Sequence, residues 1–156
     1  MKNLTLSGIC LALLLACTPS FAQEKIPVNE PDLNKPKLFS DLPDKIPVHL
    51  LDLQSFVNTE NGKQVSLKIP GNNNKGFDGK VIAAAAKYNN TIRSVVIRSA
   101  DFNGATLTLS SSIQPNGTVK FTGRIISPKH GDLFELQKEN DQYILVKKNY
   151  YDLINE

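Results

Sequence analysis

The sequence predicts an all-β protein, a small antiparallel meander barrel or sandwich of about seven strands, preceded by an extended tether. Short runs of alternating apolar and polar residues occupy the chain from Ile46 onward, and turn residues separate these runs. The links are only a few residues long, so sequential strands are expected to be neighbours in space. With 40% hydrophobic and 21% charged residues, the composition is that of a globular protein rather than a disordered one.

The first 22 residues have the pattern of a signal peptide. Lys2 supplies the positive charge, and an apolar stretch follows from Leu4 to Ala16. Ser20 and Ala22 then place small side chains before a cut at Gln23. The sequence therefore predicts export.

Cys17 offers a second interpretation of the same segment. Leu14-Leu15-Ala16-Cys17 is similar to a lipobox, in which Cys17 would be lipidated and become the first residue. A lipid on Cys17 is the only membrane attachment that we expect. Cys10 and Cys17 both precede Gln23, so the folded part is predicted to contain no disulfide and no thiolate metal site.

Residues 23–45 read as a proline-rich tether, because each proline restricts its own backbone and that of the residue before it. Two interpretations remain open, a spacer and an arm that docks on a protein partner by strand addition or groove insertion. The arm interpretation rests on apolar residues that a spacer does not require: Ile26, Val28, Leu33, Leu38, Phe39 and Leu42.

A single β domain without internal repeat is expected over residues 46–156. Its first segment is ambiguous, because Val48–Leu51 fits a strand whereas Leu50, Leu53 and Phe56 fall at helical spacing. Asn61-Gly62 predicts a turn, and a strand over Gln64–Pro70 follows it.

Two hairpins flank the clearest pair of strands. Residues 77–88 and 91–99 are predicted to pair about Asn89-Asn90, and the small side chains of Ala83–Ala86 would let another backbone approach closely. Residues 132–138 and 142–148 form the last hairpin, before a short helical turn or edge strand over 150–156. The strands between them, 105–113 and 119–125, alternate strictly. Their phase and that of the last hairpin predict the core: Leu107, Leu109, Val119, Phe121, Ile125, Phe134 and Leu136.

No catalytic residue, metal site or cofactor is predicted. The folded part has two histidines, His49 and His130, and neither belongs to a recognisable catalytic or metal-binding motif. His130-Gly131-Asp132 is interpreted as a turn in which Gly131 has a positive φ. The chain has 18 basic and 15 acidic residues, and loss of Lys2 leaves a balance of +2. That balance argues against nucleic acid or an anionic membrane as the partner.

The C-terminal half carries a resemblance to a known class of modules. Three stretches of this half are similar to β modules found ahead of secreted bacterial metallopeptidase domains: Gly117–Ile126, His130–Leu136 and Gln142–Lys147. An exported barrel with an N-terminal arm also resembles, by architecture alone, small secreted peptidase inhibitors of the potempin type and barrel inhibitors of serralysin-like enzymes. The resemblance assigns no role to an individual residue.

These observations predict an exported, monomeric, non-catalytic protein-binding module, with inhibition of a secreted peptidase as its specific form. The alternative is a structural or lipid-anchored protein of the cell envelope.

Overall fold

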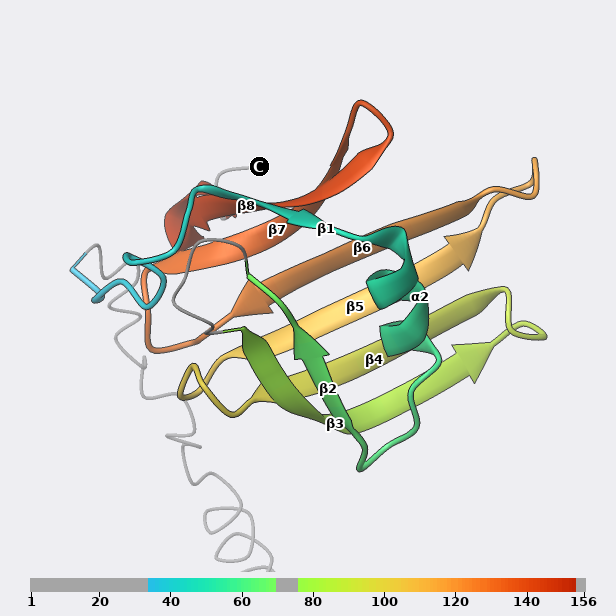
Figure 1. Ribbon diagram of the computed structural model, residues 1–156, viewed down its shortest axis with the longest axis horizontal. Coiled ribbons are helices and arrows are strands. Elements are labelled where there is room, and N and C mark those ends of the chain that lie inside the picture. Colours follow the sequence, from blue (N-terminus) through green and yellow to red (C-terminus); the bar gives the residue numbers. More distant parts are fainter. Residues whose placement is uncertain (1–33, 70–75, 154–156) are drawn as a thin grey trace, which may run out of the picture. The chain divides into compact units, whose positions relative to one another are not determined.

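The computed structural model describes residues 34–69 and 76–153, and these residues form an all-β fold. Eight antiparallel strands make one sheet in the order β1-β8-β7-β6-β5-β4-β3-β2 (Figure 1). The strands are β1 (Lys45–Val48), β2 (Gln64–Leu67), β3 (Phe77–Lys87), β4 (Ile92–Ser99), β5 (Thr106–Ile113), β6 (Val119–Ile126), β7 (Asp132–Glu139) and β8 (Gln142–Asn149). Two short helices accompany them, α2 (Leu50–Val57) and the 3₁₀ helix η1 (Tyr150–Leu153).

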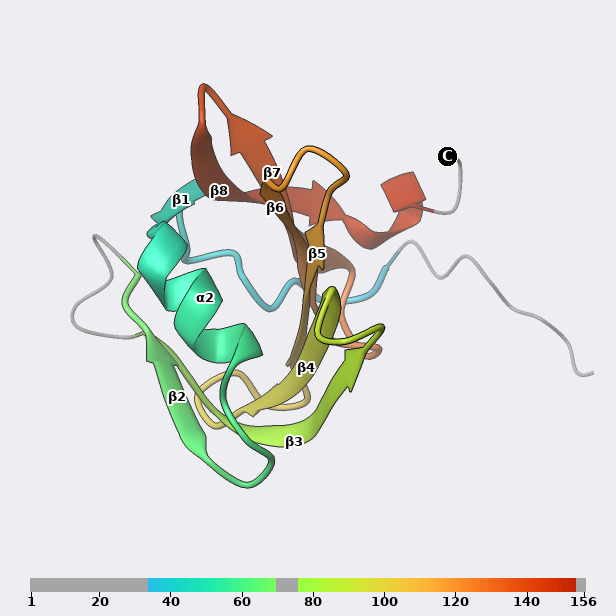
Figure 2. The ribbon, with the colours of Figure 1, turned by 90° about the vertical axis from the view of Figure 1, so that its right-hand side faces the viewer.

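The sheet is a meander that curls into a half-barrel. Strands β2 to β8 follow one another in space as in sequence, and β1 returns to pair with β8. Helix α2 lies in the concave side and packs against β4 and β5 (Figure 2). The all-β antiparallel prediction is confirmed, with one curled sheet and an inserted helix in place of two stacked sheets.

The helical interpretation of the ambiguous segment is correct from Leu50 onward, and the strand interpretation of Val48–Leu51 holds only at Val48. Ile46 and Val48 alternate with exposed residues in β1, as in a strand with one buried face. From Leu50 the burial pattern follows a helix, with Leu53, Phe56 and Val57 turned into the core. The spacing of buried residues thus changes from two, as in a strand, to that of a helix within a few residues.

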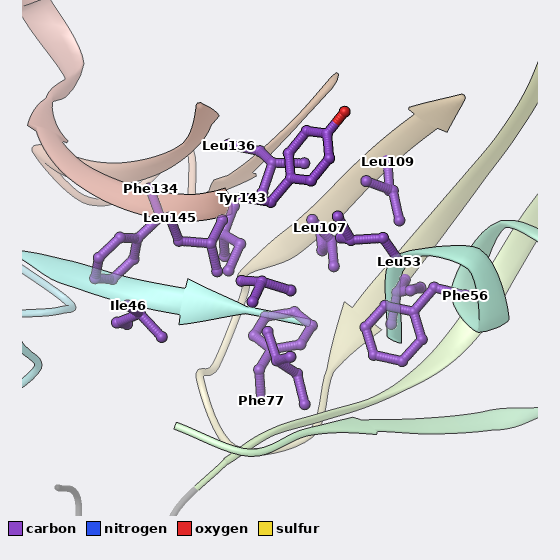
Figure 3. Close-up of a cluster of buried hydrophobic side chains, with 14 of the residues drawn as sticks. Ile46, Leu53, Phe56, Phe77, Leu107, Leu109, Phe134, Leu136, Tyr143 and Leu145 are labelled. Atoms are coloured by element: carbon purple, nitrogen blue, oxygen red, sulfur yellow. The ribbon is translucent and has the colours of Figure 1, made fainter. Parts of the chain in front are cut away.

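The core lies between the concave face of the sheet and α2 (Figure 3). Six of the seven predicted core residues are buried, and Val119 is the exception. Val119 opens β6 opposite Ile113, where the β5–β6 hairpin turns, and it is 44% exposed. An internal void of about 10 Å³ remains between α2 and the sheet, too small for more than about one water molecule.

The structure corrects the expected start of the domain. Residues 34–44, here called the strap, were expected in the tether, yet Phe39 and Leu42 are only 1% and 6% exposed in the core. The Phe39 ring lies 5.1 Å from that of Phe134 and 5.4 Å from that of Phe102, measured between ring centroids. The strap is therefore part of the folded domain.

A buried carboxylate holds the strap in place. Asp132 is 1% exposed, and its two oxygens accept hydrogen bonds from the backbone N–H groups of Leu38 (2.7 Å) and Phe39 (2.8 Å). The N–H of Gly131 donates to the Pro36 carbonyl oxygen at 3.0 Å. The expected positive φ at Gly131 is wrong. Gly131 instead allows the strap to approach closely, because a Cβ at this position would lie 3.0 Å from the Lys35 carbonyl oxygen.

Candidate protein-docking surface

His49 and His130 lie in different parts of the fold, one before α2 and the other in the turn between β6 and β7. His49 precedes α2 and makes no side-chain cap hydrogen bond to it. His130 Nδ1 lies 2.7 Å from the Oγ of Ser127, and Ser127 is completely buried, so that its hydroxyl is inaccessible to a substrate. The backbone N–H of His130 also donates to the Ser127 carbonyl oxygen (3.1 Å), which closes a turn between β6 and β7. Among residues 34–69 and 76–153, no cluster of three or more His, Cys, Asp or Glu residues could hold a metal ion.

Exposed apolar side chains gather at one end of the half-barrel. In an antiparallel meander the β3–β4, β5–β6 and β7–β8 turns all fall at the same end of the sheet, and α2 also begins there (Figure 1). This hairpin end carries six of the seven large apolar side chains that are exposed in the described part of the chain. The six residues are Leu50, Leu51, Tyr88, Ile92, Ile113 and Val119.

Three of these side chains adjoin one another, because Ile113 pairs with Val119 and Val119 lines a hollow together with Leu50. Leu51 and Tyr88 are 76% and 75% exposed, so most of each side chain lies in water. Single exposed apolar residues are ordinary, but grouped ones with a polar border are typical of protein interaction sites. The hairpin end therefore has the character of a docking surface.

A shallow hollow of about 300 Å³ lies within this end, between the start of α2 and the β7–β8 turn. Val48, Leu50 and Val119 supply apolar walls. Lys138 and Asp141 supply a polar border, with Nζ and Oδ1 2.7 Å apart. Their ion pair raises the pKa of Lys138 and lowers the pKa of Asp141.

The distal half of β3 borders the hairpin end as an open sheet edge. β2 pairs with β3 as far as Lys80, and the last main-chain bonds on that side are made by Val81 with Gly62 and Lys63. The pairing with β4 shifts register between Val81 and Ala83, and Ile82–Lys87 are exposed. Within the described residues, this stretch pairs only with β4. Its outer edge can accept an extended strand.

The outer face of the sheet carries an ion-pair network across three strands. Glu135 on β7 lies 2.7 Å from Arg124 on β6 and 2.6 Å from Lys148 on β8. Hydrogen bonding to Lys148, then to Arg124 and Gln137, lowers the pKa of Glu135 to about 2, against the effect of burial. Glu135 offsets the charge of two strand cations, so these do not form a continuous basic stripe.

The residues predicted for the partner-binding arm fall into two groups. Ile26, Val28, Leu33 and the lipidation candidate Cys17 lie outside the described residues. Leu38, Phe39 and Leu42 belong to the strap, where Phe39 and Leu42 are buried and Leu38 packs against the core. These three side chains therefore pack within the domain, and the prediction that they bind a partner is corrected.

The hairpin end was not predicted from the sequence. Ile113 and Val119 lie at strand ends, where alternation alone places them on the same face as the core, whereas Leu50 and Leu51 begin α2. Exposure there depends on how far the core extends along each strand, which is a tertiary property. The one available signal was the position of Tyr88 and Ile113 just before turn residues.

Comparison with known proteins adds no identification. No protein-family model, curated protein or solved structure matches this chain. Within the described residues there is also no helix with the length and apolar character that crossing a bilayer requires.

Proposed function

We propose that this chain is an exported, non-catalytic protein-binding module that contacts its partner through the hairpin end. A secreted peptidase is the partner class that we propose first. The observation that carries the proposal is the grouping of six exposed apolar side chains at one end of the domain. The export part of the proposal rests on the signal-peptide pattern of residues 1–22.

The filled interior supports binding of a macromolecule over carriage of a small ligand. Ligand chambers in small barrels are enclosed spaces of a few hundred Å³. Here α2 occupies the concave side of the sheet and leaves a void of about 10 Å³. Recognition by this domain is therefore assigned to its surface.

The open edge of β3 supports a peptidase as the partner. An extended main chain can form hydrogen bonds with such an edge. Many peptidase clefts bind an extended peptide through the same kind of main-chain pairing. The Ile82–Lys87 stretch lies beside the exposed apolar residues, so one partner could contact both.

The second candidate is a structural protein of the cell envelope, attached through a lipid on Cys17. Leu14-Leu15-Ala16-Cys17 favours it. Intact mass of the exported protein separates the two forms. A diacylated Cys17 supports envelope attachment, whereas a first residue of Gln23 supports the secreted module.

A triple substitution tests the binding proposal. Leu51→Asp/Ile113→Asp/Val119→Asp places three charges on the hairpin end, and the matched control Lys37→Asp/Lys129→Asp changes charge on exposed residues elsewhere. Both variants and the parent chain are assayed as inhibitors of secreted metallo-, serine and cysteine peptidases, and by cross-linking in envelope extracts. Inhibition by the parent and the control, lost in the triple variant, supports the proposal.

Two outcomes would count against it. Equal activity of the triple variant would remove the hairpin end from the binding surface. Envelope cross-links without inhibition of any peptidase would favour the structural candidate.

A further inference from the structure

The two edges of the sheet differ in how they are protected against a further strand. On the β1 edge, the Lys147 N–H donates to the Asp44 carbonyl oxygen at 2.8 Å, so residues 44 and 147 form a hydrogen-bonded pair. Such pairs alternate in an antiparallel ladder, so the nitrogen of Pro47 faces away from β8. Pro47 thus removes a donor from this edge, which opposes strand addition. The β3 edge carries neither proline nor charge over residues 82–86.

Main-chain hydrogen bonds determine which residues of β3 face the open edge. The Ser99 N–H donates to the Ala105 carbonyl oxygen at 3.0 Å, so the odd-numbered residues of β4 bond to β5. The even-numbered residues of β4 therefore bond to β3. Ser94 is one of them and lies opposite Ala85, so the main chain of Ala85 faces β4.

Ala84 and Ala86 carry the main-chain groups that face outward. Both residues adjoin Ala85 in a regular part of the strand, because the register shift between Val81 and Ala83 lies before them. On the open side, the last main-chain bonds of β3 are those of Val81 (Figure 1). Among the described residues, nothing pairs with the outward N–H and C=O groups of these two alanines.

We propose that the open edge of β3 pairs with the same edge of a second copy of this chain, antiparallel about a two-fold axis at Ala85. Ala84 of each copy then lies opposite Ala86 of the other, and every outward N–H and C=O group of these residues is paired. A register centred on Ala84 or on Ala86 would place the remaining alanine opposite Ile82, at the register shift, or opposite Tyr88, which has a positive φ. The register centred on Ala85 therefore pairs the edge most completely.

The side chains of the edge are compatible with this register. Lys87 comes opposite Ala83 of the other copy, so the two ammonium groups do not face each other. Tyr88 comes opposite Ile82 of the other copy, and these side chains are 75% and 37% exposed in the single chain. The pairing therefore brings exposed apolar side chains together at both of its ends.

The open stretch also has the length that this pairing requires. The Thr91 N–H donates to the Tyr88 carbonyl oxygen at 3.0 Å, so the chain turns back after β3. The strand of the second copy therefore ends opposite Ile82. The next residue, Val81, already donates its N–H to the Lys63 carbonyl oxygen at 2.9 Å. Neither copy has to displace β2 from the other.

The pairing is expected to be reversible and to stop at two copies. It involves fewer residues than a standard stable interface does. A two-fold axis uses up both β3 edges, and Pro47 protects the opposite edge of each sheet. This inference goes beyond the proposed function and departs from the monomer expected from the sequence. A partner that adds an extended peptide to the β3 edge would have to displace the second copy.

Disulfide trapping tests the register. The full chain, with its own two cysteines replaced by Ser, carries one new cysteine at a time. The variants are Ala84→Cys, Ala85→Cys, Ala86→Cys and, on an exposed residue elsewhere, the matched control Lys129→Cys. Only position 85 lies opposite itself, so we expect mild oxidation to give about tenfold more dimer from it than from the other three. A mixture of the variants at positions 84 and 86 should form the mixed disulfide.

A proline at the edge separates strand pairing from chance collision. Ala84→Pro removes one outward N–H and leaves the bonds of Ala83 and Ala85 to β4 in place. We expect it to lower the dimer yield of Ala85→Cys about tenfold while circular dichroism stays unchanged. If this chain does not fold, Ala84→Lys/Ala86→Lys replaces it, because like charges then lie opposite each other.

Three results would overturn the proposal: no dimer from position 85, equal dimer from all four positions, or undiminished dimer in the folded edge variant. None of these results depends on whether the hairpin end binds a partner, so the two proposals can fail separately.

Discussion

At the scale of single residues, Asp132 joins the strap to the start of β7. Its carboxylate accepts two backbone N–H groups from residues more than ninety positions away in sequence. Replacement by Ala leaves both donors without this acceptor in a buried site. Because hydrogen bonds to charged groups contribute about 1.5–3 kcal/mol, we expect Asp132→Ala to lower the free energy of unfolding by about 2–4 kcal/mol.

Denaturant unfolding measures this change, with Asp132→Asn as the matched variant that keeps one acceptor oxygen. Asn should lose less stability than Ala. A loss below about 0.5 kcal/mol for Ala would show that water or other groups satisfy the two N–H groups equally well.

Glu135 makes stability depend on pH. Its pKa is lowered from 4.5 to about 2 in the folded protein by hydrogen bonding to Lys148 and Arg124. The folded state therefore binds the proton less readily than the unfolded state. Its stabilisation is present above pH 4.5 and is lost as the pH falls from 4.5 toward 2.

We expect protonation of Glu135 to lower the free energy of unfolding by about 1–2 kcal/mol. The loss is this small because water screens an ion pair near the surface. Denaturant unfolding at pH 6 and pH 3 measures it, with Glu135→Gln as the comparison. The difference between the parent and Glu135→Gln should shrink at the lower pH. A difference that stays constant would mean that the ion pairs add nothing to stability.

At the scale of elements, the strap behaves as part of the core rather than as a linker. Phe39 is buried against Phe102 and Phe134, whereas Leu51 on α2 is 76% exposed. We expect Phe39→Ala to cost about 3–5 kcal/mol of unfolding free energy and Leu51→Ala less than about 0.5 kcal/mol. Thermal and denaturant unfolding of both variants test the comparison. Equal losses of stability would show that the strap is a tether and not part of the core.

The strands were predictable because their pattern repeats a local rule. Leu107, Leu109, Phe121 and Ile125 alternate with polar residues, and a sheet with one buried face requires that period. The burial of Phe39 was not predictable in this way. A proline-rich segment has the same composition whether it is free or packed, and contacts distant in sequence, with Asp132, Phe102 and Phe134, decide between them.

At the scale of the whole molecule, the two ends of the half-barrel differ in character. The strap and Asp132 close one end with buried contacts, while the hairpin end leaves apolar side chains in water. The shared location of these residues could not be predicted from the sequence. It depends on the fold, which brings the turns of the meander to the same end. The proposed binding function depends on this asymmetry.

The hairpin end should tolerate charge without loss of the fold. Leu51, Ile113 and Val119 are each at least 44% exposed, so their burial contributes little to stability. We expect Leu51→Asp/Ile113→Asp/Val119→Asp to change the free energy of unfolding by about 1 kcal/mol or less. Circular dichroism and denaturant unfolding verify this. A larger loss would show that these residues belong to the core.

Site-specific photo-cross-linking in cells that produce the protein shows directly whether the hairpin end contacts a partner. A photoreactive amino acid replaces Ile113 at the hairpin end in one strain and exposed Lys129 near the strap in another. We expect a discrete cross-linked species from position 113, absent from position 129 and lost when Leu51→Asp and Val119→Asp are added. Equal cross-linking from both positions, or none from position 113, would contradict it.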